Sequence, residues 1–128
     1  MMITYPMKLI KIQNSNSPEA IISAKYCESY SDKLMGLMFK KSIDPSYGII
    51  LAESSESKIN SSIHMFFMNF DITVLWLNKD RVIVDKVLAR KWKPAYVPSK
   101  PAQYTIELHE CRYDDYSIGD QLVFINEK

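Results

Sequence analysis

The sequence of 128 residues contains only three glycines, two cysteines and two histidines, and each shortage excludes a kind of site. The glycines stand singly, so no glycine-rich phosphate-binding loop is present. Cys27 and Cys111 form no CxxC pair, and neither His64 nor His109 belongs to an HxH or HExxH motif. The sequence therefore predicts no cofactor and no metal site.

An excess of charge of either sign is also absent. Sixteen basic residues oppose fifteen acidic ones, which leaves a formal net charge of +1. A chain with this balance has no global field that would steer it onto nucleic acid or an anionic membrane.

The longest apolar segment, residues 62–78, is interrupted by Asn69, Asp71 and Thr73. Crossing a bilayer as a helix takes roughly 20 predominantly apolar residues. The first six residues also lack a basic start and a small-residue cleavage site. We therefore expect a soluble, cytoplasmic protein with no membrane partner, in which both cysteines are reduced thiols.

The pattern of apolar residues predicts a mainly β fold in a single domain over residues 1–128. Apolar residues make up 47% of the chain, which is enough for an ordinary core. We expect a closed or nearly closed, barrel-like or sandwich-like domain of about six to eight short strands. One short helix is expected near residues 32–40, where Leu34, Leu37 and Met38 follow helical spacing. Strands are expected near residues 7–12, 20–26, 47–51, 82–88, 104–108 and 121–125.

The central apolar segment is predicted to form two adjacent core strands. One lies near His64–Met68 and the other near Thr73–Leu77, with a turn around Asn69–Asp71. The preceding residues, 53–62, are rich in serine, glutamate, lysine and asparagine, so we expect a solvent-exposed loop there.

A basic and aromatic stretch runs from Arg90 to Lys100 and includes Trp92 and Tyr96. Lysines interleaved with aromatic rings can hold a nucleic-acid backbone and stack a base. In the interpretation that we favour, Trp92 instead anchors this proline-rich connection onto the β domain. Nucleic acid is therefore not the favoured partner.

The order of several short motifs resembles the DUF192 family of small prokaryotic proteins, which has no established activity. Gly36-Leu37-Met38 is followed by Tyr47-Gly48-Ile49-Ile50-Leu51, by the aromatic run from His64 to Leu77, and by Tyr104-Thr105-Ile106-Glu107-Leu108 and Ile118-Gly119-Asp120. The resemblance covers about residues 24–124. It implies a single, largely β domain with no cofactor and no named substrate.

The chain departs from the family pattern at two places. The family usually carries Pro-Ile-Asp or Pro-Leu-Asp after the aromatic run, where this chain has Asp71-Ile72-Thr73. It also usually has a glycine soon after the Leu-Glu-Leu strand, where this chain has Cys111. If the family's usual aspartate were catalytic, this chain would be a weak or inactive member. If that aspartate only forms hydrogen bonds with backbone groups of a turn, which we favour, Thr73 can replace it in part.

Three functions remain open from the sequence. The favoured one is a binding or interaction module for an unidentified small molecule or protein, with a monomer or a dimer as its assembly. The second is an enzyme that uses a polar pocket around His64, Asp71 and Glu107. The third is a weak nucleic-acid binder through Arg90–Lys100. The candidate ligand-binding residues are His64, Asn69, Asp71, Thr73, Trp92 and Glu107.

Overall fold

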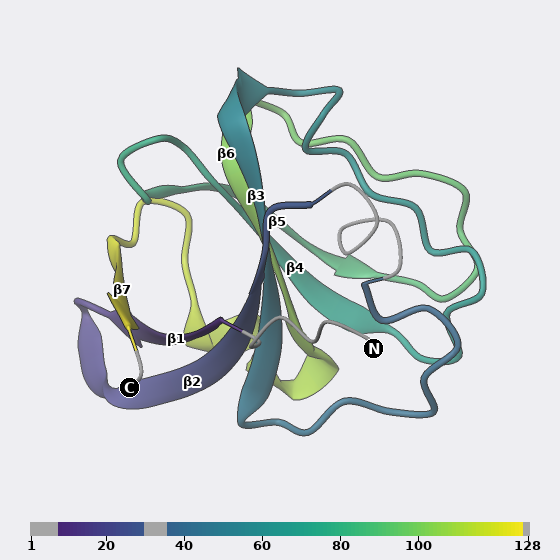
Figure 1. The fold of residues 1–128 in the computed structure, drawn as a ribbon, viewed down its shortest axis with the longest axis horizontal. Coiled ribbons are helices and arrows are strands. Elements are labelled where there is room, and N and C mark those ends of the chain that lie inside the picture. The colour runs from purple at the N-terminus through teal and green to yellow at the C-terminus, as the bar shows by residue number, and fades with distance from the viewer. Residues whose placement is uncertain (1–7, 30–35, 127–128) are drawn as a thin grey trace, which may run out of the picture.

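The computed structural model describes residues 8–29 and 36–126, which form one sheet of seven strands (Figure 1). The strands are β1 (Leu9–Asn14), β2 (Ser17–Cys27), β3 (Tyr47–Ser57), β4 (Ile72–Leu77), β5 (Ile83–Ala89), β6 (Ala102–His109) and β7 (Leu122–Asn126). Their order in the sheet is β5-β4-β6-β3-β2-β1-β7. A short 3-10 helix, η1 (Glu110–Asp115), follows β6. The predicted mainly β class is confirmed.

Two hairpins follow the local sequence pattern. β1 pairs with β2 and β4 pairs with β5, both antiparallel, whereas β2 and β3 are parallel. The β4–β5 turn contains no glycine, and Arg81 supplies its left-handed residue at φ 64°. The Asn78 side-chain oxygen accepts hydrogen bonds from the backbone N–H groups of Asp80 (2.9 Å) and Val82 (3.1 Å). This asparagine thus organises a turn that usually needs glycine.

The sheet is strongly twisted but not closed, so of the closed or nearly closed forms expected, full closure does not occur. Its two edge strands meet only where each begins, at a single bridge between Val82 and Gln121. Asp120 stabilises this junction, since its carboxylate accepts hydrogen bonds from the side-chain amides of Asn14 and Asn16, both at 2.8 Å, and from the Ser117 N–H at 2.9 Å. Burial would raise the pKa of Asp120, but these hydrogen bonds together lower it.

Both faces of the sheet are apolar. On one face, side chains from β1, β2, β4 and β6, among them Ile12, Ile22, Leu75 and Ile106, form the core between the two halves of the bent sheet. On the other face, Ile49, Val74 and Trp76 form a second core. All six residues of β4 are buried as a result.

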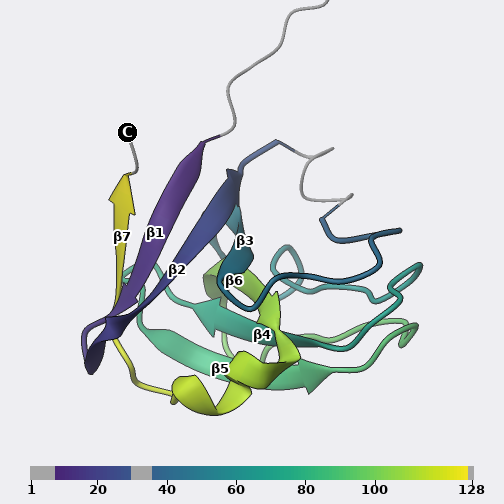
Figure 2. The same cartoon turned by 90° about the horizontal axis from the view of Figure 1, so that it is seen from below.

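Loops, rather than helices, cover the second face. The connections at residues 36–46, 58–71 and 90–101 extend away from β7 and pack over β4 and β6 (Figures 1 and 2). Leu37, Ile63, Met65 and Met68 from two of these loops are buried in the second core. No helix of the described part of the chain has the length and hydropathy needed to cross a bilayer.

The predicted strand at His64–Met68 is therefore wrong, whereas the one at Thr73–Leu77 is confirmed as β4. The segment is a loop whose Met65 and Met68 point into the core, while Phe66 and Phe67 are exposed. Phe67 adopts a left-handed φ of 60°, which interrupts an extended strand. Its backbone partners are other loops: the Met65 N–H donates to the Lys93 carbonyl at 3.0 Å.

Two further boundaries differ from expectation. β3 continues to Ser57, so the first part of the expected loop at 53–62 is strand. The helix expected near 32–40 falls partly outside the described residues, and its described part, residues 36–39, forms a turn. Positive φ values at Gly36 (41°) and Phe39 (65°) prevent a right-handed helix there.

Gly48 is required by the close approach of β3 to β6. A Cβ at this position would collide with Leu108 Cδ2 and lie 3.1 Å from the Glu107 carbonyl oxygen. The glycine therefore allows β3 to pack closely against the strand that carries Glu107.

We predict that Asp120→Ala lowers the free energy of unfolding by about 2 kcal/mol, because it leaves the buried Asn14 amide without its acceptor. The pKa of Asp120 is lowered in the folded state, so its contribution is complete above the unfolded-state pKa near 4 and is lost as the pH falls through the folded value. Urea unfolding followed by circular dichroism at pH 7 and below pH 4 measures both effects.

The control is Asp114→Ala, which changes an exposed carboxylate on η1. It should change the unfolding free energy by less than about 0.5 kcal/mol. Equal losses in the two variants would contradict the role given to Asp120.

Candidate ligand-binding site

A pocket of about 190 Å³ opens between β3, β6, the loop that follows β3 and residues 36–38 of the connection before β3. Its walls are partly apolar, with Leu51, Ile63 and Met68, and its polar groups come from both strands and the loop. The polar lining residues are Glu53, Asn60, Ser61, Ser62, His64, Thr105 and Glu107. Neither lysine nor arginine lines the pocket in the described part of the chain.

Glu107 is the central polar group of this pocket. It lies in the middle of β6, between Ile49 of β3 and Val74 of β4, and the alternation of β6 directs its side chain to the second core. The residue is only 7% exposed, and no hydrogen bond or ion pair joins its carboxylate to another described residue; its oxygens face the space of the pocket and are not sealed in the core. Burial raises the pKa of Glu107 to about 7. A buried carboxylate without a partner is costly, and such residues are concentrated at functional sites.

One backbone carbonyl of the loop after β3 fixes the position of that loop relative to the sheet, and so the shape of the pocket. The Ser61 carbonyl oxygen accepts hydrogen bonds from Trp76 Nε1 at 2.8 Å and from Thr105 Oγ1 at 3.1 Å. Both donors are buried, on β4 and β6 respectively. The Ser61 hydroxyl also donates to the Ser57 carbonyl. These bonds fix the loop at a defined distance from the sheet, so the pocket exists before any ligand binds.

His64 lies in the same pocket as Glu107 and is half-buried. Its Nδ1 accepts a hydrogen bond from the Phe66 N–H at 3.2 Å. In the neutral ring the proton therefore resides on Nε2, which makes Nε2 a hydrogen-bond donor. Two of the six residues selected from the sequence, His64 and Glu107, thus come together in space.

Asp71 and Asn69 lie outside the pocket and bind other loops. Asp71 accepts a hydrogen bond from the Lys91 N–H at 2.8 Å and pairs with Arg90 Nη1 at 3.0 Å. The Lys91 N–H lowers the pKa of Asp71 against the opposing effect of burial, with Arg90 adding to it. The Asn69 amide donates to the Lys40 carbonyl at 2.9 Å. Both side chains therefore connect the loops that cover the sheet.

Thr73 and Trp92 are also separate from the pocket. Thr73 points to the opposite face of β4 from Val74, and its Oγ1 donates to the Glu110 carbonyl of η1 at 3.3 Å. Trp92 does not anchor its loop as expected, because it is 51% exposed. Tyr96 has that role: it packs against the second core, exchanges backbone hydrogen bonds with Ile63, and its hydroxyl accepts from the Arg90 N–H.

The sequence did not indicate the remaining polar residues of the pocket. Asn60, Ser61 and Ser62 belong to a segment whose composition is typical of a solvent loop. Glu53 and Thr105 do not belong to any motif that would mark them in the sequence. Extending the alternation of β3 through Ile49 and Leu51 would have placed Glu53 on the face of Glu107.

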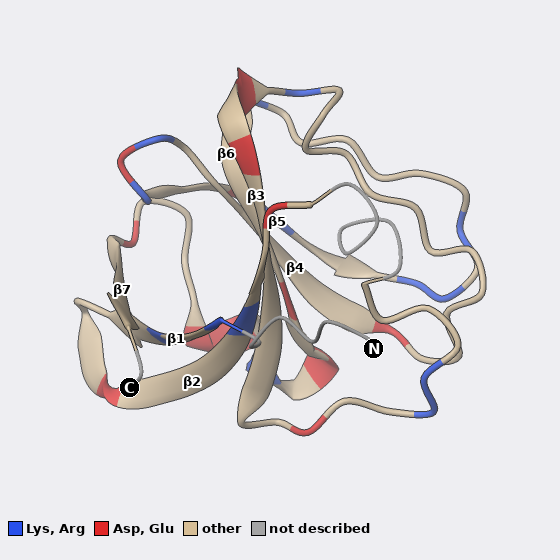
Figure 3. Cartoon of the chain, viewed as in Figure 1, with Lys and Arg blue, Asp and Glu red and all other residues tan. Residues whose placement is uncertain are grey.

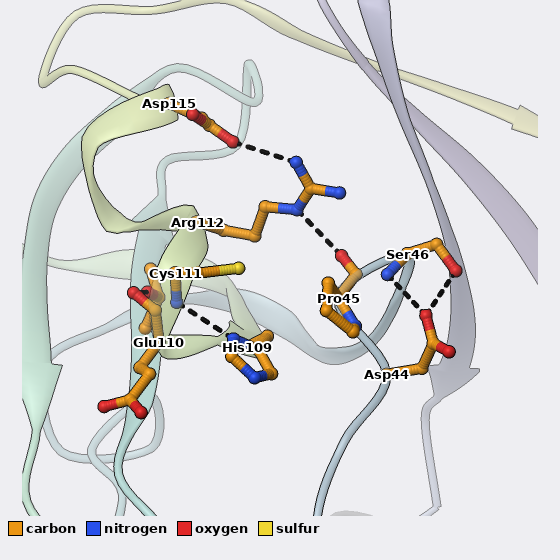
Figure 4. Close-up of polar contacts among 9 residues, drawn as sticks. Asp44, Pro45, Ser46, His109, Glu110, Cys111, Arg112 and Asp115 are labelled. Atoms are coloured by element: carbon orange, nitrogen blue, oxygen red, sulfur yellow. Dashed lines mark hydrogen bonds and ion pairs between the residues drawn. The ribbon is translucent and has the colours of Figure 1, made fainter.

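A second polar cluster surrounds His109 and η1 but holds neighbouring elements together (Figure 4). His109 Nδ1 accepts from the Cys111 N–H at 3.0 Å, and Arg112 Nε donates to the Pro45 carbonyl at 2.8 Å. Cys111 is exposed and Cys27 is buried, and no disulfide joins the two. Across the described ranges, no three histidine, cysteine, aspartate or glutamate side chains are grouped as metal ligands would be.

Sequence comparison finds relatives of unknown activity. The DUF192 family, described as "Uncharacterized ACR", matches residues 10–124. A UPF0127 protein of Thermococcus kodakarensis is 40% identical over 83 residues, which cover 65% of this chain and 51% of that protein. A UPF0127 protein of Pyrococcus furiosus is 35% identical over 89 residues, covering 70% and 73% respectively. The match thus spans about half the length of the first relative.

Two solved structures share the fold at low sequence identity. A proposed transcription regulator from Sinorhizobium meliloti has a TM-score of 0.80 at 15% identity, covering 97% of this chain and 98% of that one. A protein of unknown function from Novosphingobium aromaticivorans has a TM-score of 0.76 at 12% identity, covering 90% and 83%. At these identities the likeness concerns the fold alone.

The burial of Glu107 predicts a specific dependence of stability on pH. Folding raises the pKa of Glu107 from its ordinary value of 4.5 to about 7, so the folded protein binds the extra proton between these values. The contribution of Glu107 to stability is therefore complete below about pH 4.5, falls as the pH rises, and levels off above about pH 7. The loss amounts to about 3 kcal/mol.

Glu107→Gln removes this titration, so its unfolding free energy relative to the natural chain should rise between pH 5 and pH 8. Glu110→Gln is the matched control, because Glu110 is exposed three positions along the chain. Urea unfolding across this pH range makes the comparison. Parallel stability curves for the natural chain and Glu107→Gln would show that Glu107 is not buried without a partner.

Proposed function

The chain belongs to the DUF192 family, and we propose that it acts as a binding module for a small ligand that presents a positive charge to Glu107. The observation that carries this proposal is the buried carboxylate of Glu107, which lines a pocket and has no partner among the described residues. A protonated amine or a guanidinium would supply both the missing hydrogen bonds and the missing charge.

The rest of the lining supports a cationic ligand. Glu53 follows Leu51 on the same face of β3, so a second carboxylate borders the pocket. The loop after β3 adds Asn60 and Ser62 to the lining of the pocket, and both have neutral hydrogen-bonding side chains. With no lysine or arginine in the described lining, an anionic ligand would find no fixed positive charge there to oppose the ionised Glu107 carboxylate.

The pocket's size restricts the ligand. Its volume of about 190 Å³ is below the range of roughly 300–1,000 Å³ typical of drug-sized ligands. A small metabolite, or the cationic end of a larger molecule, matches this space. The apolar wall formed by Leu51, Ile63 and Met68 favours a ligand with a short aliphatic portion beside its charged group.

Binding is favoured over the catalytic grouping of His64, Asp71 and Glu107. Asp71 lies outside the pocket and is held by Arg90 and the Lys91 N–H. Of these three residues only His64 and Glu107 line the pocket, and a buried acid can hold a cation without a catalytic partner. The binding module therefore accounts for the geometry with fewer assumptions.

We predict that small aliphatic amines and guanidines raise the thermal unfolding midpoint, whereas carboxylates of the same length do not. A ligand at 100 times its Kd stabilises the folded state by about 2.7 kcal/mol. Binding should strengthen as the pH rises through about 7, because Glu107 then ionises. Thermal shift at pH 6 and pH 8, followed by NMR titration of the amides of Ser62, Ile63 and Thr105, measures affinity and location.

Glu107→Gln should abolish the stabilisation by amines, and Glu110→Gln should retain it. Stabilisation by carboxylates instead of amines, or equal binding to Glu107→Gln, would contradict the proposal. Perturbation of amides on η1 instead of those at the pocket would place any binding elsewhere.

A further inference from the structure

Three exposed aromatic rings gather on the outer surface of the loops, on the side away from the sheet. This aromatic cluster consists of Phe39 (61% exposed), Phe67 (44%) and Trp92 (51%), one from each of the three covering loops. Phe39 stacks on Phe67 with ring centroids 5.0 Å apart, and Trp92 meets Phe67 edge-on at 5.3 Å. Large apolar groups grouped on the surface in this way usually mark an interaction site.

The same three residues have unusual backbone conformations. Phe39, Phe67 and Trp92 have φ values of 65°, 60° and 66°, and they are three of the four non-glycine residues with positive φ in the described chain. Bulky side chains rarely adopt this region, and strained residues concentrate at functional sites. Glycine would relieve the strain at each position, so the aromatic rings are maintained against the backbone preference.

Backbone hydrogen bonds hold the cluster in place. The Phe39 N–H donates to the Phe67 carbonyl at 3.0 Å, and the Trp92 N–H donates to the Met65 carbonyl at 2.8 Å. Met65 itself is fully buried in the second core. The rings therefore project from a fixed platform that needs no rearrangement to bind a partner.

Lysines without a carboxylate partner among the described residues lie next to two of the three rings in the sequence. Lys40 and Lys41 follow Phe39, and Lys91 and Lys93 flank Trp92; all four are exposed. None of them forms an ion pair with a carboxylate of the described residues. The carboxylate of Asp71, which lies on the same loops, is already neutralised by Arg90. Figure 3 shows these basic segments along the loops that extend away from β7.

We propose that the aromatic cluster and its lysines bind single-stranded nucleic acid, with bases stacked on the exposed rings and phosphates beside the lysines. Every unpaired base presents a face to an aromatic ring, and the phosphate spacing suits a border of lysines. A duplex hides its base faces, and a peptide of acidic residues alone has no ring to stack on the cluster. Since the net charge is only +1, binding is weak and depends on both stacking and local charge.

Trp92 also provides the signal for the test. It is exposed, whereas the second tryptophan, Trp76, is 1% exposed, so a stacked base quenches only Trp92 fluorescence. The probes are fluorescein-labelled oligothymidine and oligouridine of about 15 nucleotides and a DNA duplex of equal length. Anisotropy is measured at about 50 mM and about 200 mM salt. The DNA and RNA arms show which of the two single strands the surface prefers.

The variants separate ring function from folding. Trp92→Gly and Phe67→Gly remove a ring and relieve the positive φ, so we expect their unfolding midpoints to be maintained while affinity for single strands falls about tenfold or more. Ile118→Ala, at a residue that is 60% exposed outside the cluster, is the control and should bind normally. Replacing Lys91 and Lys93 by alanine should weaken binding and reduce its salt dependence.

The matched charge control replaces Lys11 and Lys79, which are exposed elsewhere, and should leave affinity unchanged. The proposal is overturned if no single strand binds at low salt, or if the glycine variants bind as the natural chain does. It is also overturned if the duplex binds as tightly as the single strands. Equal competition by poly-glutamate would instead assign the surface to an acidic protein segment.

Discussion

The structure depends on the need to cover a sheet that is apolar on both faces. β4 is buried at every position, and β6 is buried along most of its length. Bending of the sheet covers one face, but the described chain contains only one short 3-10 helix and no element that could pack on the other as a layer. Three loops must therefore exclude water from Val74, Trp76 and their neighbours.

This constraint explains why the loops are ordered by polar contacts that reach the sheet. A loop over an apolar face has backbone groups that require partners away from water. Trp76 and Thr105 satisfy the Ser61 carbonyl, and Asp71 satisfies the Lys91 N–H. The loops also bind one another, as Tyr96 does with Ile63. The covering layer is thus irregular in conformation but fixed in position.

Both proposed sites follow from this arrangement. The pocket forms where the loop after β3 is held off the sheet, so that Glu107 faces a space instead of a side chain. The aromatic cluster forms on the outer side, because Met65 and Met68 turn inward and leave Phe67 outside. One loop, residues 58–71, therefore lines the pocket on its side facing the sheet and carries Phe67 of the aromatic cluster on its outer side.

Local sequence patterns predicted the strands that pair with chain neighbours. The β1–β2 and β4–β5 hairpins follow from alternating residues and a polar turn, which are short-range signals. The segment at His64–Met68 had the composition of a strand, yet it forms a loop, in which Phe67 has a left-handed φ of 60° and the Met65 N–H donates to the Lys93 carbonyl of another loop. Trp92 was similarly expected to anchor its loop on the sheet, but Tyr96 is the residue of that loop that packs against the second core.

The sequence by itself determined the mainly β class, the hairpins and the absence of common motifs, since these depend on residue type and spacing along the chain. It also offered six candidate binding residues, His64 and Glu107 among them, without indicating which of them lie together. The tertiary structure alone decided that these two residues share a pocket while Asp71 and Thr73 do not. The sheet order places β6 between β3 and β4, and this long-range pairing buries Glu107. Such pairing depends on contacts between distant segments, which no local pattern encodes.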